Sequence, residues 1–177
     1  MTNTPPEAHA ASPPRAGLLL ATGFGLGYAP VAPGTAGSLG AAALFALLHW
    51  ALEGAAFHYA YLFVLAWLVP LSLWSTEQAL GYWKTHDPQA VVIDEILGQW
   101  LTYSGLVLAA LAGWPAAGWK YLLAGFILFR AFDIVKPFPI RRSERLGGAA
   151  GVVVDDALAG AYAAAVLGAL VWTGWLN

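Results

Sequence analysis

Five carboxylates lie at the edges of long apolar segments of this chain. Asp94 and Glu95 stand in VVIDEILGQW, Asp133 in FRAFDIVKPFPIRR, and Asp155 and Asp156 in GVVVDDALAG. An ionised carboxylate beside lipid is costly unless it is paired, hydrated or bound to a cation. These five residues are therefore the first candidates for chemistry.

The composition indicates an integral membrane protein. Hydrophobic residues make up 59% of the 177 residues and charged residues 10%, whereas soluble domains carry about 25% charged residues. Because a helical span needs about 20 mostly apolar residues, we expect an all-α, polytopic bundle of four to five transmembrane helices. The predicted spans lie near 36–53, 57–75, 91–112, 118–135 and 152–175.

The rest of the chain bounds the possible functions. Residues 1–15 are rich in Pro and Ala, a composition that predicts a disordered tail. They lack the basic start and apolar run of a signal peptide. We therefore expect residues 16–177 to form one integral-membrane catalytic domain. The absence of cysteine excludes disulfides, thiolate metal sites and a cysteine nucleophile. Nothing indicates nucleic acid as a partner, because the basic residues gather in one short loop.

That basic loop predicts how the chain is oriented. Its residues Lys136, Arg141, Arg142 and Arg145 outnumber Glu144, so the positive-inside rule puts it in the cytoplasm. Alternating spans then put the loop at 76–90 on the same side. All five carboxylates fall at one depth, at the cytoplasmic ends of three spans.

Carboxylates gathered at a low-dielectric boundary repel one another unless cations balance them, so we expect an oxygen-ligand site for Mg²⁺. Capping or interfacial solvation would explain any single pair, but three groups at one depth favour a metal site. Adjacent helical residues diverge by about 100°, so one member of each pair is expected to coordinate and the other to orient. Gly98 and Gly160 lie one turn deeper, where small residues allow helices to approach closely.

Two segments could hold a phosphate. The stretch 23–40 is dense in Gly and Pro and predicts an ordered loop or a re-entrant turn before the first span; its PGTAGS core offers backbone N–H groups and the hydroxyls of Thr35 and Ser38. On its own, a turn that aids helix packing explains this stretch as well. Arg130, Lys136 and Arg141 surround Asp133 and could bind phosphate oxygens, although an ion-paired helix end is an equally simple explanation.

The loop pair His86–Asp87 could supply a base or another ligand, although a loop histidine is more often only exposed to solvent.

In this order and spacing, GFGLGYAPVAPGTAGS, HDPQAVVIDEILGQW, FRAFDIVKPFPIRR and GGAAGVVVDDALAG resemble the phosphatidylglycerophosphatase A family from about residue 17 to 170. The resemblance implies a Mg²⁺-dependent lipid phosphatase of the bacterial inner membrane that converts phosphatidylglycerophosphate in the cytoplasmic leaflet to phosphatidylglycerol. It also implies that Asp94, Glu95, Asp133, Asp155 and Asp156 form the catalytic set. Within it we take Glu95, Asp133 and Asp156 as the expected metal ligands, while the division of roles inside each pair stays open.

Two other functions could also use acidic residues in membrane helices. A phosphotransferase of the CDP-alcohol type also uses aspartates at helix ends and a divalent metal, but its signature is absent from the sequence. A small transporter or ion-binding protein would place its charges near the midplane in broken helices, whereas these charges gather at one edge.

Overall fold

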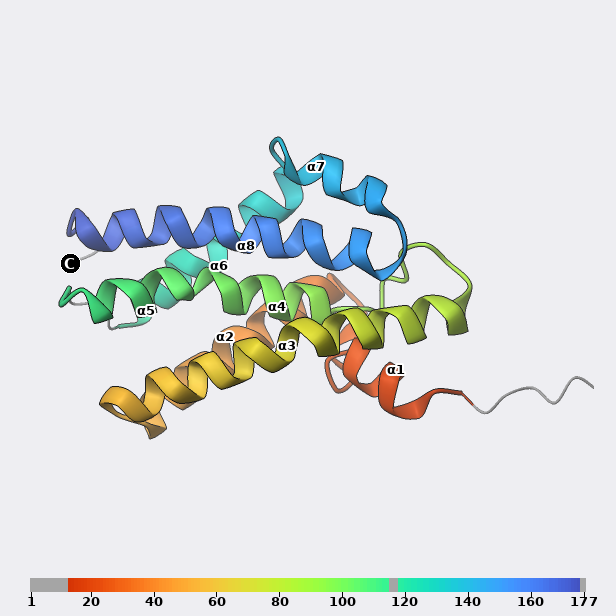
Figure 1. Cartoon of the computed structure of the whole chain (residues 1–177), viewed down its shortest axis with the longest axis horizontal. Coiled ribbons are helices and arrows are strands. Elements are labelled where there is room, and N and C mark those ends of the chain that lie inside the picture. Colours follow the sequence, from red (N-terminus) through yellow and green to blue (C-terminus); the bar gives the residue numbers. More distant parts are fainter. Residues whose placement is uncertain (1–12, 115–117, 176–177) are drawn as a thin grey trace, which may run out of the picture.

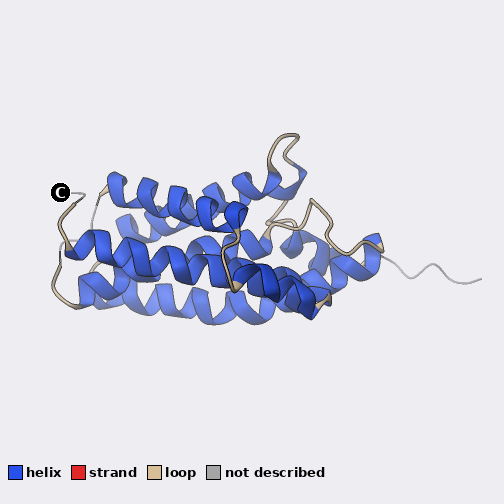
Figure 2. Cartoon of the chain, turned by 90° about the horizontal axis from the view of Figure 1, so that it is seen from above, coloured by secondary structure: helices blue, strands red, loops and turns tan. Residues whose placement is uncertain are grey.

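The computed structural model describes residues 13–114 and 118–175, and within these ranges it contains helices and no strands (Figures 1 and 2). The prediction of an all-α chain is therefore confirmed. The elements are α1 Arg15–Ala21, η1 Leu26–Tyr28, α2 Pro33–Ala51, α3 Gly54–Trp83, α4 Ile93–Thr102, α5 Ser104–Leu111, α6 Trp119–Val135, α7 Ile140–Ser143, η2 Glu144–Leu146 and α8 Gly148–Trp172. Residues 1–12 of the predicted tail lie outside the described ranges.

Three of the described helices, α2, α3 and α8, are long and apolar enough to cross a membrane. The predicted third span is divided between α4 and α5 at Tyr103, and α6 has 17 residues. The number of spans expected from the sequence, four to five, therefore stays a prediction. The helices themselves lie where the apolar segments predicted them.

The Gly- and Pro-rich segment 23–40 is a loop only in its first part. Residues 23–32 form turns and the short helix η1, whereas PGTAGS forms the first turns of α2. Proline lacks the N–H that a first helical residue would leave unpaired, so Pro33 is well suited to start a helix. The helix consequently begins three residues before the predicted span.

The helices α2, α4 and α8 run in one direction, and α3 and α6 return in the other (Figure 1). The helices α4 and α8 cross closely: a Cβ on Gly160 would lie 2.3 Å from the carbonyl oxygen of Gly98. A Cβ on Gly105 would lie 2.3 Å from the carbonyl oxygen of Ala164. The prediction that Gly98 and Gly160 allow close helix approach is confirmed.

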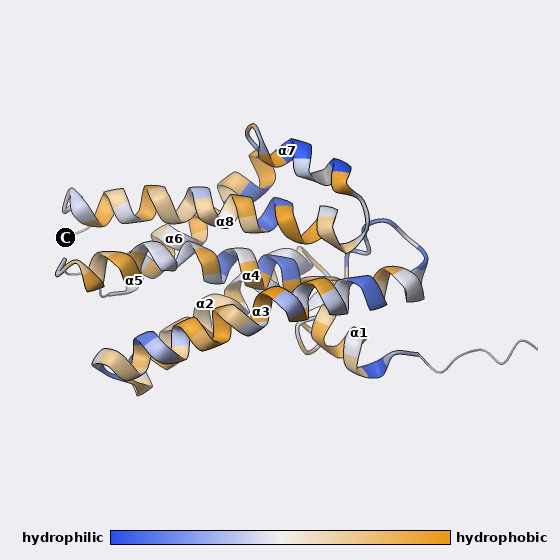
Figure 3. Ribbon diagram, viewed as in Figure 1, coloured by the Kyte–Doolittle hydropathy of each residue, from blue (hydrophilic) through white to orange (hydrophobic). Residues whose placement is uncertain are grey.

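Aromatic side chains hold the middle of the bundle together. The phenol of Tyr61 donates to the carbonyl of Trp100 at 3.0 Å, and the Trp100 indole donates to the carbonyl of Tyr61 at 3.4 Å. Phe45 and Tyr103 pack against this pair within the same buried cluster. Hydrophilic residues of α4, α7 and α8 gather toward the other end, where α1 and α7 lie (Figure 3).

The start of α4 is fixed by its neighbours. The Val92 N–H donates to the carbonyl of Ala21 at 2.8 Å, and the Ser72 hydroxyl donates to the carbonyl of Ile93 at 3.3 Å. Ala21, Ala79, Val91 and Ile93 form a small apolar cluster around these bonds. This packing sets where the next two residues, both acidic, point.

Candidate metal centre and active site

Three carboxylates converge at the crossing of α4 and α8. One oxygen each from Asp94, Glu95 and Asp156 can be chosen so that all lie within 4.8 Å of one another. Asp94 and Asp156 are buried, with 6% and 4% exposed surface, and Glu95 is partly buried. We call these three residues the acidic trio.

The acidic trio fits the requirements of a hard divalent cation. Three carboxylate oxygens are a donor set of the kind that Mg²⁺ prefers, and this ion usually completes its coordination with water or substrate oxygens. One carboxylate oxygen of Glu95 is buried without a hydrogen-bond partner in the described part of the chain. A buried, unpaired carboxylate oxygen needs a cation or a proton, so the trio could hold a metal ion.

The trio differs from the ligand set expected from the sequence. Asp94 joins it, while Asp133 is not a member and forms an ion pair with Arg130, with 2.7 Å between Asp133 Oδ2 and Arg130 Nη1. Both members of the first acidic pair therefore reach the same place. In the first turn of α4 the Glu95 N–H donates to Asp94 Oδ1 at 3.1 Å, which holds the Asp94 side chain beside Glu95.

The second acidic pair is divided by its surroundings. Asp156 belongs to the trio, whereas Asp155 forms an ion pair with Lys136, the residue that ends α6 in a left-handed conformation before Pro137. Both aspartates lie beyond the first turn of α8, which begins at Gly148. Capping of a helix end, which would explain a single acidic pair, therefore does not explain these two residues.

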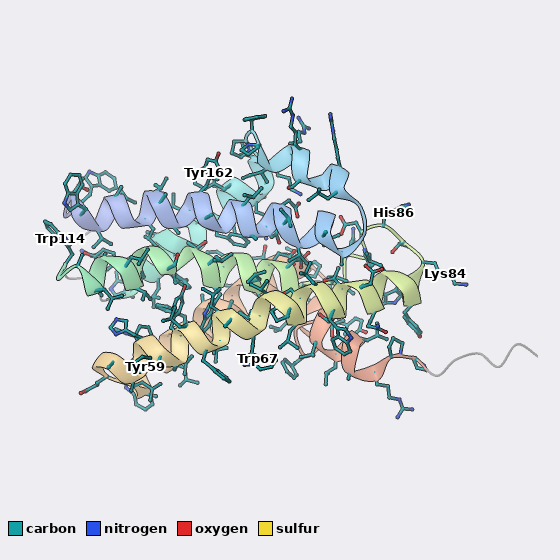
Figure 4. The ribbon with its side chains drawn as sticks, viewed as in Figure 1. Tyr59, Trp67, Lys84, His86, Trp114 and Tyr162 are labelled. Carbon is teal, nitrogen blue, oxygen red and sulfur yellow. The ribbon has the colours of Figure 1, made fainter. Side chains whose placement is uncertain are left out.

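A cavity of about 550 Å³ brings the predicted catalytic residues together. All five carboxylates line it, as do Lys136 and the loop pair His86–Asp87, and its wall is completed by the glycine-rich start of α8. We call it cavity 1. His86 and Lys84 lie at the same end of the molecule, far from Trp114 at the other end (Figure 4).

A second cavity, of about 700 Å³, is lined by Arg130 and by residues 27–30, 32–34, 87 and 89–91. We call it cavity 2. It shares Asp87, Asp94 and Glu95 with cavity 1. Gly34 makes room for the acidic trio here, because a Cβ on this residue would lie 2.1 Å from the Glu95 Oε1.

The residues predicted to bind phosphate are not all brought to these cavities. Lys136 lines cavity 1 and Arg130 lines cavity 2. Among the described residues, the linings of both cavities lack Thr35, Ser38 and Arg141. The Ser38 hydroxyl is buried and donates to the carbonyl of Gly34 at 2.9 Å, and Arg141 is exposed on α7.

One acidic residue near the site has a role that sequence reasoning left open. The carboxylate of Glu77, on α3, accepts a hydrogen bond from the Ala149 N–H at 3.3 Å, at the start of α8. It therefore caps a helix that carries two site residues. No sequence signal links two residues 72 positions apart in this way.

Comparison with known proteins identifies a family. Residues 19–171 match the model of the family described as phosphatidylglycerophosphatase A. A Haemophilus influenzae protein named "Phosphatidylglycerophosphatase A" is 39% identical, over 86% of this chain and 86% of its own length. An Escherichia coli K12 protein of the same name is 35% identical, over 84% of this chain and 80% of its own length.

A protein of Bacteroides thetaiotaomicron named "Putative phosphatidylinositol-3-phosphatase" is 36% identical, over 88% of this chain and 93% of its own length. No solved structure matches the chain. The matched region contains the acidic trio, both cavities and every helix from α2 to α7. The chain therefore belongs to the phosphatidylglycerophosphatase A family of lipid phosphatases.

Proposed function

We propose that this protein hydrolyses the terminal phosphomonoester of phosphatidylglycerophosphate to phosphatidylglycerol and inorganic phosphate, with Mg²⁺ as cofactor. The observation that carries the proposal is the acidic trio, three carboxylates within 4.8 Å, beside a cavity that Lys136 also lines. Carboxylates for a cation and a lysine for an anion are the groups that metal-assisted phosphate chemistry requires. Two relatives bear the name of this activity.

The name of the Bacteroides relative adds a second candidate substrate, phosphatidylinositol 3-phosphate. Both lipids carry a phosphodiester beside the acyl chains and a phosphomonoester further along the head group. The chemistry at the scissile bond is thus the same for both. A direct comparison of the two lipids as substrates decides between them.

When bound to the acidic trio, Mg²⁺ would contribute Lewis-acid stabilisation of the phosphate charge during hydrolysis. Lys136, on the wall of cavity 1, is placed to donate to a phosphate oxygen. Thr35, Ser38 and Arg141 stay predicted phosphate partners that substitution would test, whereas Arg130 borders the neighbouring cavity.

We propose Asp155 as the base that accepts a proton from the attacking water. Its Oδ2 contacts Lys136, while its Oδ1 is buried and has no hydrogen-bond partner among the described residues. This oxygen is therefore available as a proton acceptor. Asp94 belongs to the acidic trio, which this proposal assigns to the cation.

We also propose that the site faces the cytoplasm from the bacterial inner membrane. The basic residues after α6 and the loop that carries Lys84 and His86 lie at the same end of the bundle as the acidic trio (Figure 4). The positive-inside rule assigns such an end to the cytoplasm. A lipid head group of the inner leaflet would reach the cavities at that depth.

The test is phosphate release by the purified protein from phosphatidylglycerophosphate, with Mg²⁺ or with a chelator. We expect activity only with the metal, and a loss of about 100-fold or more in Asp156→Asn and Asp133→Asn. Glu53→Gln is the matched control, because Glu53 is an exposed carboxylate at the start of α3, at the other end of the bundle. Full activity in chelator would exclude the metal site.

Two further arms separate the alternatives. In the first arm, phosphatidylinositol 3-phosphate is supplied in place of phosphatidylglycerophosphate. The better substrate of the two is the one with the higher kcat/KM. A CDP-linked lipid with an alcohol acceptor is supplied in the second. Product formed only in this second arm would indicate a phosphotransferase in place of a phosphatase.

A further inference from the structure

Cavity 2 adjoins the catalytic cavity but differs from it in charge. Six carboxylates line cavity 1, together with Lys136 and His86. Three carboxylates line cavity 2, and all three are shared with cavity 1. The residues that belong to cavity 2 alone include no acidic side chain and one cation, Arg130.

Arg130 is held firmly where it borders cavity 2. Its guanidinium lies 2.7 Å from the Asp133 carboxylate, and its side chain is only 19% exposed. The first turn of α2 packs against it, because a Cβ on Gly34 would lie 3.4 Å from one terminal nitrogen. A guanidinium has five N–H donors in a fixed plane, so the ion pair with Asp133 leaves donors for a second anion.

The lipid of the proposed function carries two different phosphates. A terminal phosphomonoester carries about two negative charges near neutral pH, while a phosphodiester carries one. The doubly charged group suits the metal-binding cavity. The singly charged group suits cavity 2, the less acidic of the two, where Arg130 has N–H donors beyond those used by Asp133 and where Gln89 and Tyr28 add polar groups.

Building on the proposed function, we infer that cavity 2 binds the phosphodiester of the lipid substrate, with Arg130 as its cationic partner. The phosphomonoester then lies in cavity 1, and the head group passes the Asp94 and Glu95 border between the two. Arg130 is thus a specificity-determining residue that selects lipids with a second, internal phosphate.

The experiment measures binding of dihexanoyl phosphatidylglycerol, a short-chain lipid that has only the phosphodiester, to the full chain in detergent by calorimetry. We expect Arg130→Gln to weaken this binding about tenfold or more, since a charge-assisted hydrogen bond is lost. Arg130→Lys should retain part of the wild-type affinity for dihexanoyl phosphatidylglycerol. Arg145→Gln is the matched control, because it removes one exposed positive charge outside both cavities.

Binding of inorganic phosphate in the presence of Mg²⁺ is measured on the same proteins. We expect Arg130→Gln to weaken phosphate binding less than it weakens phosphatidylglycerol binding, because Arg130 lines cavity 2 and reaches cavity 1 only through Asp133. If Arg130→Gln weakens phosphate binding more than phosphatidylglycerol binding, Arg130 serves the phosphomonoester and the inference is wrong.

A second variant tests the cavity without disturbing the ion pair. Ala29 lines cavity 2, and Ala29→Trp would fill part of it, so binding of dihexanoyl phosphatidylglycerol should fall at least about tenfold. Equal binding by the wild type, Arg130→Gln and Ala29→Trp overturns the inference. Binding of the diester by a protein that hydrolyses neither lipid would instead overturn only the proposed function.

Discussion

At the scale of single residues, the second acidic pair is the most informative. Asp155 and Asp156 are neighbours on α8, yet one contacts Lys136 and the other belongs to the acidic trio. Helical geometry turns adjacent side chains about 100° apart, and within α8 this sends the two carboxylates to different partners. Their substitutions should therefore have different effects.

We expect Asp156→Asn to raise the Mg²⁺ concentration for half-maximal activity by about tenfold or more, because a charged ligand is lost. Asp155→Asn should lower kcat by about 100-fold and leave the Mg²⁺ dependence nearly unchanged, as removal of a general base does. Both values come from phosphate release measured over a Mg²⁺ titration. Identical Mg²⁺ shifts in the two variants would contradict the division of roles.

Gly34 gives a second prediction at this scale. Because a Cβ here would lie 2.1 Å from the Glu95 Oε1, Gly34→Ala must displace that carboxylate. We expect about a tenfold or larger rise in the Mg²⁺ requirement, with the protein still folded. Gly81→Ala is the control, because Gly81 lies in α3 with open space around it and should retain activity. Equal Mg²⁺ requirements in both variants would show that Gly34 is not needed for the trio.

At the scale of elements, the crossing of α4 and α8 sets the position of the trio. Gly160→Ala would place a Cβ 2.3 Å from a backbone carbonyl oxygen, which cannot move aside as a side chain can. We expect this variant to lose about 1–3 kcal/mol of stability, the cost of overpacking. Thermal inactivation in detergent measures it.

The matched control for this substitution lies two turns further along α8. A Cβ on Gly168 would lie 3.6 Å from the carbonyl oxygen of Gly105, an ordinary contact. Gly168→Ala should change stability by less than about 0.5 kcal/mol. Equal stability losses at both positions would mean that the close contact is not what matters.

The apolar segments predicted where the helices lie better than where they end. The second span was predicted to stop at 75, but α3 continues to Trp83 through the polar residues Glu77 and Gln78. Hydropathy reports the apolar part of a helix, and α3 stays helical beyond it. The same limit explains why α8 begins four residues before its predicted span.

Much of the candidate site could also be predicted from the sequence. Three of the four motifs contain the five carboxylates, and cavity 1 brings them together. The sequence could not divide them into a trio and two ion pairs, because that division depends on how α4, α6 and α8 rotate against one another. It also could not indicate cavity 2, whose wall joins loops about 60 residues apart.

At the scale of the whole molecule, the orientation can be tested because the chain contains no cysteine. Single cysteines in place of Lys84 and Arg145 should react with a membrane-impermeant thiol reagent only from the cytoplasmic side. A cysteine in place of Trp114, at the other end of the bundle, should react only from the opposite side (Figure 4). Labelling of positions 84 and 145 from opposite sides would rule out a single shared site.

The contact between the backbones of Gly98 and Gly160 has a consequence for ion selectivity. Glu95 and Asp156 belong to helices whose backbones touch at Gly98 and Gly160, and moving the two carboxylates apart would cost this packing. Ca²⁺ needs oxygen ligands at about 2.3–2.6 Å and more of them, against about 2.0–2.1 Å for Mg²⁺. Ca²⁺ should therefore support little hydrolysis and compete with Mg²⁺ only weakly, so that the bundle discriminates between two ions of equal charge by how closely two helices meet.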